Sequence, residues 1–319
     1  MKVARSGGGL QLQGKKHPFL KSLWDHKLLY LFLVPGLIWF FVFCYSPMYG
    51  VLIAFKDYDI AKGVFGSEWV GFKHFLDFFK DPVFPRLMRN TLVISLLKIV
   101  IGFPMPIILS LMLNEVRHKT YKRVTQTISY LPYFISWVVV LGIWKDLFSI
   151  NEGSLINTLL MNLGIISEPI AFFGSTSTII PMVIATDVWK SLGFSTILYL
   201  AAMSNVNPEL YEAATIDGAG RFRRIWHITL SAIKPTILLL FILGMGGILN
   251  AGFDQLWIMD NPQVSEWIDV IDTYVARQGI FRARYELSTA VGLFKSIVGV
   301  ILILATNLVV KITGEEGLL

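Results

Sequence analysis

Four ionisable side chains interrupt long apolar stretches of this sequence: Lys98, Asp187, Lys190 and Lys295. If these stretches cross a membrane, the charges are costly there, and such residues are by default candidates for function. Asp187 and Lys190 are three positions apart, so they share one face of a helix and could pair. The pair would either line a polar path through the membrane, or form an internal ion pair or a link to a partner subunit. For Lys98 and Lys295 we expect structural roles, reaching toward an interface or a neighbouring subunit.

Composition indicates that these stretches belong to an integral membrane protein. Of 319 residues, 54% are hydrophobic and 16% are charged, whereas soluble domains carry about 25% charged residues. The mean hydropathy of +0.61 excludes a disordered chain. Although the net charge is +6, the basic residues flank apolar runs instead of forming one patch, which argues against nucleic acid as a partner. Cys44 is the single cysteine and the five histidines lack metal-ligand spacing, so we expect no disulfide framework and no metal site.

The apolar runs predict an all-α protein with six transmembrane helices. A spanning helix needs about 20 mostly apolar residues. Six segments qualify: about 28–55, 92–113, 127–144, 179–203, 233–251 and 289–310. The first run follows a basic tail, but it is too long for the core of a signal peptide and no small-residue cleavage site closes it. We therefore expect a cytoplasmic tail over residues 1–27 and one transmembrane domain over residues 28–319.

The distribution of lysine and arginine predicts which loops face the cytoplasm. The tail and the loops after the second and fourth runs are rich in basic residues, whereas the loop after the third run holds only Lys145. Both termini are therefore predicted to be cytoplasmic. Residues 56–91 are an exception, because they carry six basic residues yet lie outside in this topology. Within them, residues 72–91 are amphipathic and predict a helix along the outer membrane face, or alternatively a packed extracellular loop.

A near match to a phosphate-binding loop occurs at Gly9–Lys16, with the sequence GLQLQGKK. The pattern GxxxxGK[ST] needs a hydroxyl at its last position to hold magnesium, but Lys16 stands there. No strand is predicted before it, and His17-Pro18 follows where a helix should begin. We therefore expect no ATPase site on this chain, so that any use of ATP requires a separate subunit.

The predicted cytoplasmic loop 207–230 has the sequence of a short helix–turn–helix. Asn207 suits an N-cap and Pro208 the first helical position, so a helix can run to about Ile216. The following segment 217–220, DGAG, ends that helix because glycine tolerates positive φ. A second helix with an apolar stripe can begin near Gly220. Such a compact knob could dock into a groove on a partner protein.

This loop resembles the EAA loop of the permeases of ATP-binding-cassette (ABC) importers. Glu212-Ala213-Ala214 is followed after three residues by Gly218 and after nine more by Ile228-x-Leu230, although Ser231 stands where the family usually has proline. In that family the loop is a coupling helix that inserts into a cleft on the ATPase subunit. Gly218 would then allow the turn, and Glu212 or Asp217 would meet basic residues of the ATPase. The resemblance implies a docking surface made of Glu212, Ala213, Ala214, Asp217, Gly218 and Arg221.

The rest of the chain is similar to carbohydrate ABC importer permeases of the maltose-permease-like superfamily. Residues 69–114 resemble the start of the transporter core, and residues 250–299 resemble the polysaccharide- or oligosaccharide-permease branch. The resemblance implies the ABC type I importer fold, a multi-pass location in the bacterial cytoplasmic membrane, and alternating access. It implies as partners a second permease subunit that is a different but related chain, two ATPase subunits that bind ATP and magnesium, an extracellular solute-binding protein, and a sugar, which we expect to be an oligosaccharide. This chain is expected to bind no cofactor and to have no enzyme activity.

Sugars bind by stacking on aromatic faces, while amides and carboxylates form hydrogen bonds with their hydroxyls. In maltose-type permeases the chain after the fifth span approaches the substrate, so by resemblance the polar residues there are candidates for the substrate path. Aromatic residues of the third run are candidates for stacking, although aromatics at this depth also serve in packing or as interfacial anchors. The complete set of path candidates is Tyr133, Trp137, Asp187, Lys190, Asn250, Asp254 and Gln255.

Two other classes of membrane protein are alternatives. A secondary transporter driven by an ion gradient would be expected to show inverted repeats and carboxylates in broken helices. Asp187 is the only acidic residue well inside a run, and no repeat is visible. A membrane enzyme would need a nucleophile–base pair or a metal-ligand spacing, and the sequence shows neither. Dependence of transport on a separate ATPase would distinguish an ABC importer from the ion-driven carrier.

Overall fold

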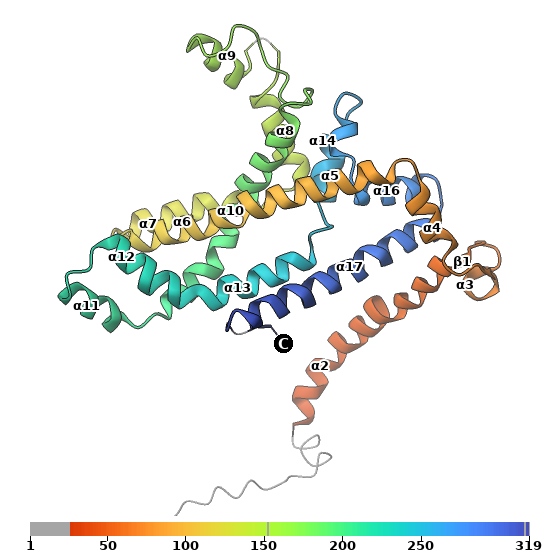
Figure 1. Ribbon diagram of the computed structural model, residues 1–319, viewed down its shortest axis with the longest axis horizontal. Coiled ribbons are helices and arrows are strands. Elements are labelled where there is room, and N and C mark those ends of the chain that lie inside the picture. The colour runs from red at the N-terminus through yellow and green to blue at the C-terminus, as the bar shows by residue number, and fades with distance from the viewer. Residues whose placement is uncertain (1–25, 152, 316, 319) are drawn as a thin grey trace, which may run out of the picture. The chain divides into compact units, whose positions relative to one another are not determined.

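The computed structural model describes residues 26–151, 153–315 and 317–318. The near match to a phosphate-binding loop at Gly9–Lys16 and nearly all of the predicted tail 1–27 lie outside the described residues. What is described is mostly helical, in agreement with the predicted all-α class (Figure 1). The chain divides into two units, Met1–Leu52 and Ile53–Leu319.

The described residues of the first unit, from residue 26 onward, form a single apolar helical run. Three segments follow one another: α2 (Lys27–Phe40), the π-helical η1 (Phe41–Tyr45) and the 3₁₀-helical η2 (Ser46–Phe55), which continues into the second unit. No side chain of α2 or η1 is buried, and nearly all are apolar. A helix that is apolar on all sides is suited to hydrocarbon. This run therefore coincides with the first predicted span.

The second unit begins with a short antiparallel pair of strands, β1 (Lys56–Asp57) and β2 (Glu68–Trp69). Its other elements are α3 (Gly63–Gly66), α4 (Lys73–Lys80), α5 (Phe84–Leu97), η3 (Lys98–Gly102), α6 (Pro104–Glu115), α7 (Lys119–Tyr130), η4 (Leu131–Phe134), α8 (Trp137–Leu147), α9 (Leu155–Asn162), α10 (Ile179–Ser204), α11 (Pro208–Ile216), α12 (Arg221–Arg224), η5 (Ile225–Thr229), α13 (Leu230–Gly246), α14 (Phe253–Met259), α15 (Ser265–Ile268), α16 (Ile271–Ala276), η6 (Arg277–Phe281) and α17 (Tyr285–Ile312).

Four helical runs of the described chain are long and apolar enough to cross a membrane: Lys27–Phe55, Phe84–Glu115, Arg221–Gly246 and Tyr285–Ile312. A fifth is added if the bent pair Lys119–Phe134 and Trp137–Leu147 is one span. The fourth predicted run, 179–203, coincides with α10, a helix of 26 residues. It is not among these runs because two charged residues, Asp187 and Lys190, and several polar ones interrupt it. The structure thus gives four to five candidate spans, and a sixth would have to be α10.

The predicted span over residues 127–144 is not one uninterrupted helix. α7 passes into the 3₁₀ turn η4, and α8 then begins at an angle of 106° to it. Ser136 adopts an extended backbone between them and caps α8, because its hydroxyl accepts a hydrogen bond from the Val139 N–H at 3.4 Å. The bend interrupts the helical hydrogen-bond pattern at the end of η4, which matters for the site described below.

A π-helical turn, η3, widens the long run from α5 to α6. Pro104 follows this turn after one intervening residue, Phe103. Proline has no N–H, and its ring would clash with the carbonyl group four residues earlier, that of Val100. A regular α-helix therefore cannot pass through this point, and the widened turn accommodates the proline. Lys98 is the first residue of the widened turn.

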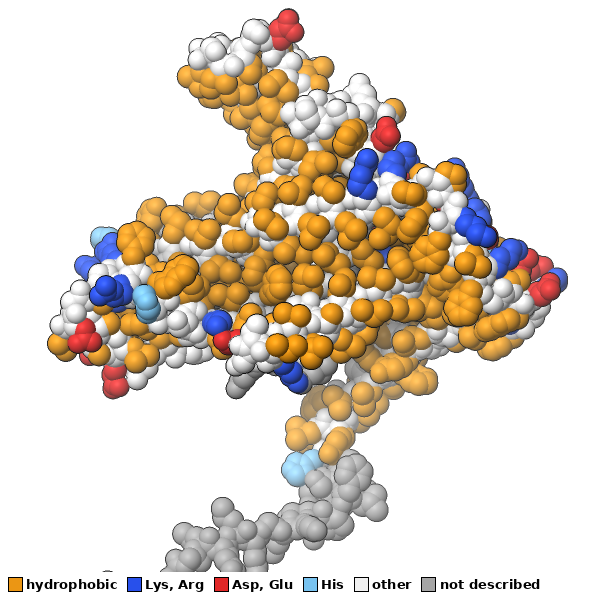
Figure 2. Space-filling model, in the orientation of Figure 1, with side chains coloured by type: hydrophobic (Ala, Val, Ile, Leu, Met, Phe, Trp, Pro, Cys, Tyr) orange, Lys and Arg blue, Asp and Glu red, His pale blue; other side chains and the backbone are white. Residues whose placement is uncertain are grey.

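The core of the second unit joins helices from distant parts of the chain. One buried cluster brings together Ile94 of α5, Leu141 of α8, Val183 of α10 and Leu256 of α14. On the face shown in Figure 2, hydrophobic side chains cover the middle of this unit, while charged side chains gather over α11 and α12 and, at the opposite end, near α4. This distribution is typical of a helical body embedded in lipid with polar ends in water.

Residues 72–91 form α4 and the beginning of α5. Phe78 of α4 is 1% exposed and packs with Leu87 of α5, Tyr274 of α16 and Leu287 of α17. The amphipathic pattern is therefore explained by packing on the rest of the unit, which favours the packed loop over a helix lying alone on the membrane surface.

Candidate functional site

The 207–230 loop forms the predicted helix–turn–helix, and α11 and α12 lie together at one end of the second unit (Figure 1). Asn207 caps α11, because its side-chain oxygen accepts a hydrogen bond from the Glu209 N–H at 3.0 Å. Pro208 occupies the first turn, where the missing N–H is not needed. The start of α11 is therefore determined by local sequence.

Gly218 ends α11 in a left-handed conformation, with φ of +74°. The Gly218 N–H donates to the Thr215 carbonyl at 3.1 Å, and the Ala219 N–H donates to the Ala214 carbonyl at 2.8 Å. These two bonds form a Schellman motif, which requires a residue with positive φ and favours glycine. A Cβ added at Gly218 would meet no atom within 4 Å. Glycine is thus needed for the backbone conformation, while the space beside it is open.

Hydrogen bonds attach α11 to the helix that follows. The Tyr211 hydroxyl and the Thr229 hydroxyl lie 2.9 Å apart, and Thr229 is 1% exposed. Arg224 donates to the Thr215 hydroxyl at 2.9 Å. The second helix does not end near Ser231: it passes from α12 through the π-helical η5 into α13 as far as Gly246. A displacement of α11 would therefore act directly on a long membrane helix.

The predicted docking residues lie on the outside of this knob. Five of them are exposed and Ala214 is partly buried: Glu212, Ala213, Asp217, Gly218 and Arg221 are the exposed ones. Two large apolar side chains flank the turn, Ile216 at 88% exposed and Phe222 at 89% exposed. Arg221 also reaches Glu115 at the end of α6, with 3.7 Å between Nε and Oε2. The surface combines exposed apolar groups with both signs of charge, as a protein-docking surface does.

Lys98, Asp187 and Gln255 form a buried polar cluster between η3, α10 and α14. The Lys98 ammonium lies 2.8 Å from Asp187 Oδ1 and 2.7 Å from Gln255 Oε1. The Gln255 amide nitrogen donates to the Val183 carbonyl and to the Thr186 hydroxyl, both at 2.7 Å. Gln255 is fully buried. Both polar atoms of its amide thus form hydrogen bonds within the protein, and the cluster connects three helical segments.

The predicted pair between Asp187 and Lys190 does not form. Asp187 pairs with Lys98 instead. Lys190 donates to the carbonyl groups of Pro132, Tyr133 and Ile135 at 3.2, 2.8 and 2.5 Å. These groups lie at the bend before α8, and the Pro132 carbonyl also accepts a hydrogen bond from the Ile135 N–H at 3.3 Å. Helical spacing places the two side chains on a common face. Lys190 nevertheless binds the backbone carbonyl groups at the bend and not Asp187.

Tyr133 and Trp137 both surround the Lys190 ammonium, which lies 5.6 and 5.5 Å from their ring centroids. Tyr133 also stacks on Phe194 with ring centroids 3.9 Å apart and an angle of 5°. One face of the Tyr133 ring is therefore covered by the chain itself. Tyr133 is still 41% exposed, so part of its surface is not covered by the chain.

Asn250 and Asp254 are exposed, as path residues must be. Asn250 lines a cavity of about 260 Å³ together with Asp272, Lys295 and Ser296. Lys295 forms an ion pair with Asp272. Sequence reasoning did not single out Asp272, because it lies 23 positions from Lys295, on a different helix. No helical spacing relates the two residues.

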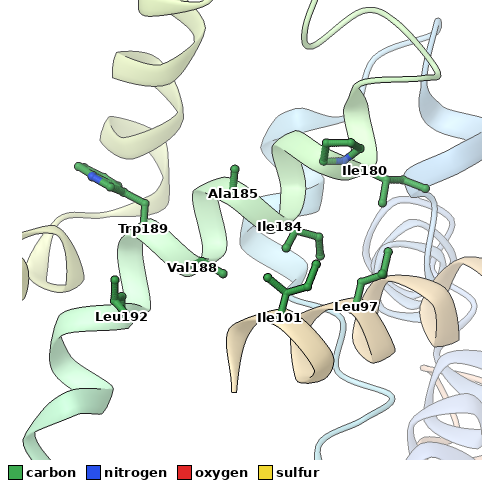
Figure 3. Close-up of a pocket in the computed structure, with 9 residues that line it drawn as sticks. Leu97, Ile101, Ile180, Ile184, Ala185, Val188, Trp189 and Leu192 are labelled. Atoms are coloured by element: carbon green, nitrogen blue, oxygen red, sulfur yellow. The ribbon is translucent and has the colours of Figure 1, made fainter. Parts of the chain in front are cut away.

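Another cavity is of a different kind (Figure 3). It has a volume of about 720 Å³ and lies between the α5–η3 run and α10. Its lining residues are Leu97, Ile101, Ile180, Pro181, Ile184, Ala185, Val188, Trp189 and Leu192. Apart from the Trp189 indole, none of these side chains can form a hydrogen bond with a hydroxyl. A cavity of this chemistry suits hydrocarbon and does not suit a sugar.

Segment 56–91 is joined to the C-terminal part of the chain by polar contacts. Arg86 lies 3.6 Å from Asp269, which also pairs with Arg277. Tyr274 donates a hydrogen bond to Asp81 at 2.8 Å. Burial raises the pKa of the Tyr274 phenol, and the hydrogen bond to Asp81 raises it further.

Comparison with known proteins identifies the chain's relatives. Residues 102–314, which include the 207–230 loop, match the family model described as binding-protein-dependent transport system inner membrane component. The chain is 49% identical to the protein LplB of Bacillus subtilis (strain 168) over 305 residues, which are 96% of this chain and 95% of LplB. It is 45% identical to the polygalacturonan/rhamnogalacturonan transport system permease protein YteP of the same organism, over 95% of this chain and 94% of YteP.

A solved structure shows the same fold. A chain in the crystal structure of a bacterial alginate ABC transporter in complex with alginate pentasaccharide-bound periplasmic protein matches with a TM-score of 0.84 and 38% sequence identity. The match covers 95% of this chain and 100% of that one.

Proposed function

Because the chain belongs to the binding-protein-dependent transport system inner membrane components, we propose that it is the permease subunit that imports an oligosaccharide containing uronate units. The family places the chain in the cytoplasmic membrane as a multi-pass component of an ABC importer. The observation that carries the role in an ATP-driven importer is the exposed knob of the 207–230 loop. Gly218 lies at the turn of this knob, and the helical run Arg221–Gly246 continues from it.

The substrate class follows from the relatives' substrates. YteP is a permease for polygalacturonan and rhamnogalacturonan, and the similar solved transporter carries alginate, an acidic polysaccharide. We infer that this chain also takes an acidic oligosaccharide, with Asn250, Asp254, Tyr133 and Trp137 as candidates for direct contact. Asp187 and Lys190 are used within the protein, so they would shape the path through the helices that they hold.

The topology that fits this function has six spans with both termini in the cytoplasm. Five are the apolar runs, if α7–η4 and α8 act together as one broken span, and α10 is the sixth. The charges within α10 are tolerable in a membrane because they are bound by Lys98 and by the carbonyl groups of η4. This topology places the 207–230 loop on the cytoplasmic side.

The complete importer would contain this chain, a second and different permease, two ATPase subunits and an extracellular solute-binding protein. ATP and magnesium would bind to the ATPases. Ile216 and Phe222 would enter a cleft on one ATPase, while Glu212 and Asp217 meet basic residues at its edge. The Tyr211–Thr229 hydrogen bond would then transmit a movement of α11 to α13, and rigid-body motion of the helices would switch access from one side to the other.

A pull-down experiment tests this proposal. The tagged chain is purified from its native membranes as the parent, as Gly218→Trp and as Gly164→Trp. Gly164 is a matched control, because it also has positive φ with open space around it but lies outside the 207–230 loop. We expect an ATPase to be recovered with the parent and with Gly164→Trp, and to be lost with Gly218→Trp. Recovery of the ATPase with Gly218→Trp would refute the docking site.

A further inference from the structure

Lys295 and Asp272 face a polar cavity that is separate from the Lys98–Asp187 cluster. The cavity of about 260 Å³ is bounded by the end of α13, by α16 and by α17. Its polar side chains are Asn250, Asp272, Lys295 and Ser296, and Gly246 and Gly292 leave parts of its wall without side chains. Drug-sized ligands occupy about 300–1,000 Å³. This cavity is therefore suited to a single small ring, such as one sugar unit.

Lys295 keeps hydrogen-bond donors available in this cavity. Its side chain is 11% exposed, and Asp272 is its only polar partner among the described residues. An ammonium group has three donors. The other lysines at membrane depth differ: Lys98 binds two side-chain oxygens and Lys190 binds three carbonyl groups. Lys295 is the one whose surroundings leave room for a further acceptor.

Asn250 adds an amide that no other described residue uses. Its side chain is exposed to the cavity, and within the described residues it forms no hydrogen bond. A neighbouring cavity of about 350 Å³ shares Asp272 and Val275 with the first and is also lined by Phe253 and Tyr285. Aromatic faces beside amide, ammonium and carboxylate groups are the combination that sugars require.

We propose that Lys295, Asp272 and Asn250 form a subsite that recognises one uronate unit of the passing oligosaccharide. Lys295 donates to the sugar carboxylate, Asp272 accepts hydrogen bonds from neighbouring hydroxyls, and Asn250 bonds a further hydroxyl. When the subsite is empty, Asp272 balances the charge of Lys295. Because a bound carboxylate must compete with Asp272, binding is weak enough for release, as transport requires. This inference rests on the proposed function, since it assigns the residues that choose the substrate.

The experiment compares two sugars in proteoliposomes that contain the whole importer. Uptake of oligogalacturonate and of the same oligosaccharide with its carboxyl groups reduced to alcohols is measured for the parent and for Lys295→Gln. We expect Lys295→Gln to lower uptake of the acidic sugar at least about tenfold, the loss of one charge-assisted hydrogen bond, with little change for the reduced sugar. The matched control is Lys311→Gln, which removes one positive charge from the same helix outside the cavity.

A charge exchange distinguishes recognition of the sugar carboxylate by Lys295 from a purely structural role of the Lys295–Asp272 ion pair. The double variant Lys295→Asp with Asp272→Lys keeps a pair of opposite charges but reverses their positions. ATPase stimulation by the loaded solute-binding protein shows which variants are assembled. A subsite predicts that the exchanged variant is stimulated but does not recover uptake of the acidic sugar. Recovered uptake in the exchanged variant, or equal loss of both sugars with Lys295→Gln, would overturn the subsite alone. Failure of the parent importer to take up either sugar would instead overturn the proposed function, and the subsite with it.

Discussion

Removing the Lys98 ammonium should destabilise the membrane body strongly, because two acceptors depend on it. In the variant Lys98→Met, Asp187 loses a partner at 2.8 Å and Gln255 loses one at 2.7 Å. The side chains of Lys98 and Asp187 are 14% and 25% exposed, so neither is well solvated. The remaining carboxylate would then be a largely buried charge with no counter-ion.

The size of the effect follows from these contacts. Breaking a buried pair by removing one partner costs 3–5 kcal/mol, and the partial exposure of Asp187 places this case at the lower end, at about 3 kcal/mol. About 2 °C of melting temperature is lost per kcal/mol in a chain of this length, which gives about 6 °C. The double variant Lys98→Met with Asp187→Leu removes both charges and leaves only the Gln255 oxygen without its donor, a cost of about 1 kcal/mol.

The assay measures the apparent melting temperature of the purified importer in detergent. The readout is the loss of the monodisperse complex as the temperature rises. We expect Lys98→Met to melt about 6 °C below the parent and the double variant only about 2 °C below it. Asp254→Asn is the control, because it removes an exposed carboxylate that has no partner among the described residues, and it should shift the melting temperature little. A double variant that is no more stable than Lys98→Met would refute the reasoning, since the isolated charge would then not be the cause.

Three further predictions concern the 207–230 loop and the hydrogen bond between Tyr274 and Asp81. Gly218→Asn should retain ATP hydrolysis by the purified complex, because asparagine tolerates positive φ, whereas Gly218→Val should lose it; equal activity of the two would contradict the role of the left-handed turn. Tyr211→Phe removes the hydrogen bond to buried Thr229, about 1 kcal/mol, and should speed limited proteolysis of the loop relative to the parent; an unchanged rate would mean that this bond does not hold α11 in place. Tyr274→Phe should cost about 1.5 kcal/mol near neutral pH through loss of the bond to Asp81. Because the pKa of Tyr274 is raised above 10.0, the folded state holds its proton more tightly, so this stabilisation is complete below pH 10 and is lost as the pH rises further. Above pH 10 the melting temperature of the parent should therefore fall more steeply with pH than that of Tyr274→Phe. An equal fall for both proteins would contradict this prediction.

Local signals in the sequence predicted the helix–turn–helix of the 207–230 loop well. Asn207 and Pro208 determine where α11 begins, and Gly218 determines where it ends, through contacts within a few residues. Apolar length likewise located four of the predicted runs. These features depend on the chain near each residue, so they could be read without knowledge of the tertiary structure.

Pairing of the membrane charges could not be predicted in this way. Helical spacing favoured Asp187 with Lys190, but Lys98, 89 positions away, is brought to Asp187. The bend before α8 supplies Lys190 with carbonyl groups that an unbroken helix would not have exposed. Asp272 likewise meets Lys295 only because α16 packs beside α17. These contacts depend on tertiary packing, which no local pattern encodes.

The most direct test is uptake by proteoliposomes that contain the complex purified through this tagged chain. Labelled oligogalacturonate is supplied with the solute-binding protein on one side, and ATP is enclosed or omitted on the other. We predict uptake that requires both ATP and the binding protein and that continues when ionophores abolish all ion gradients. Uptake that proceeds without ATP and stops with the ionophores would contradict an ATP-driven importer and would point to a carrier driven by an ion gradient.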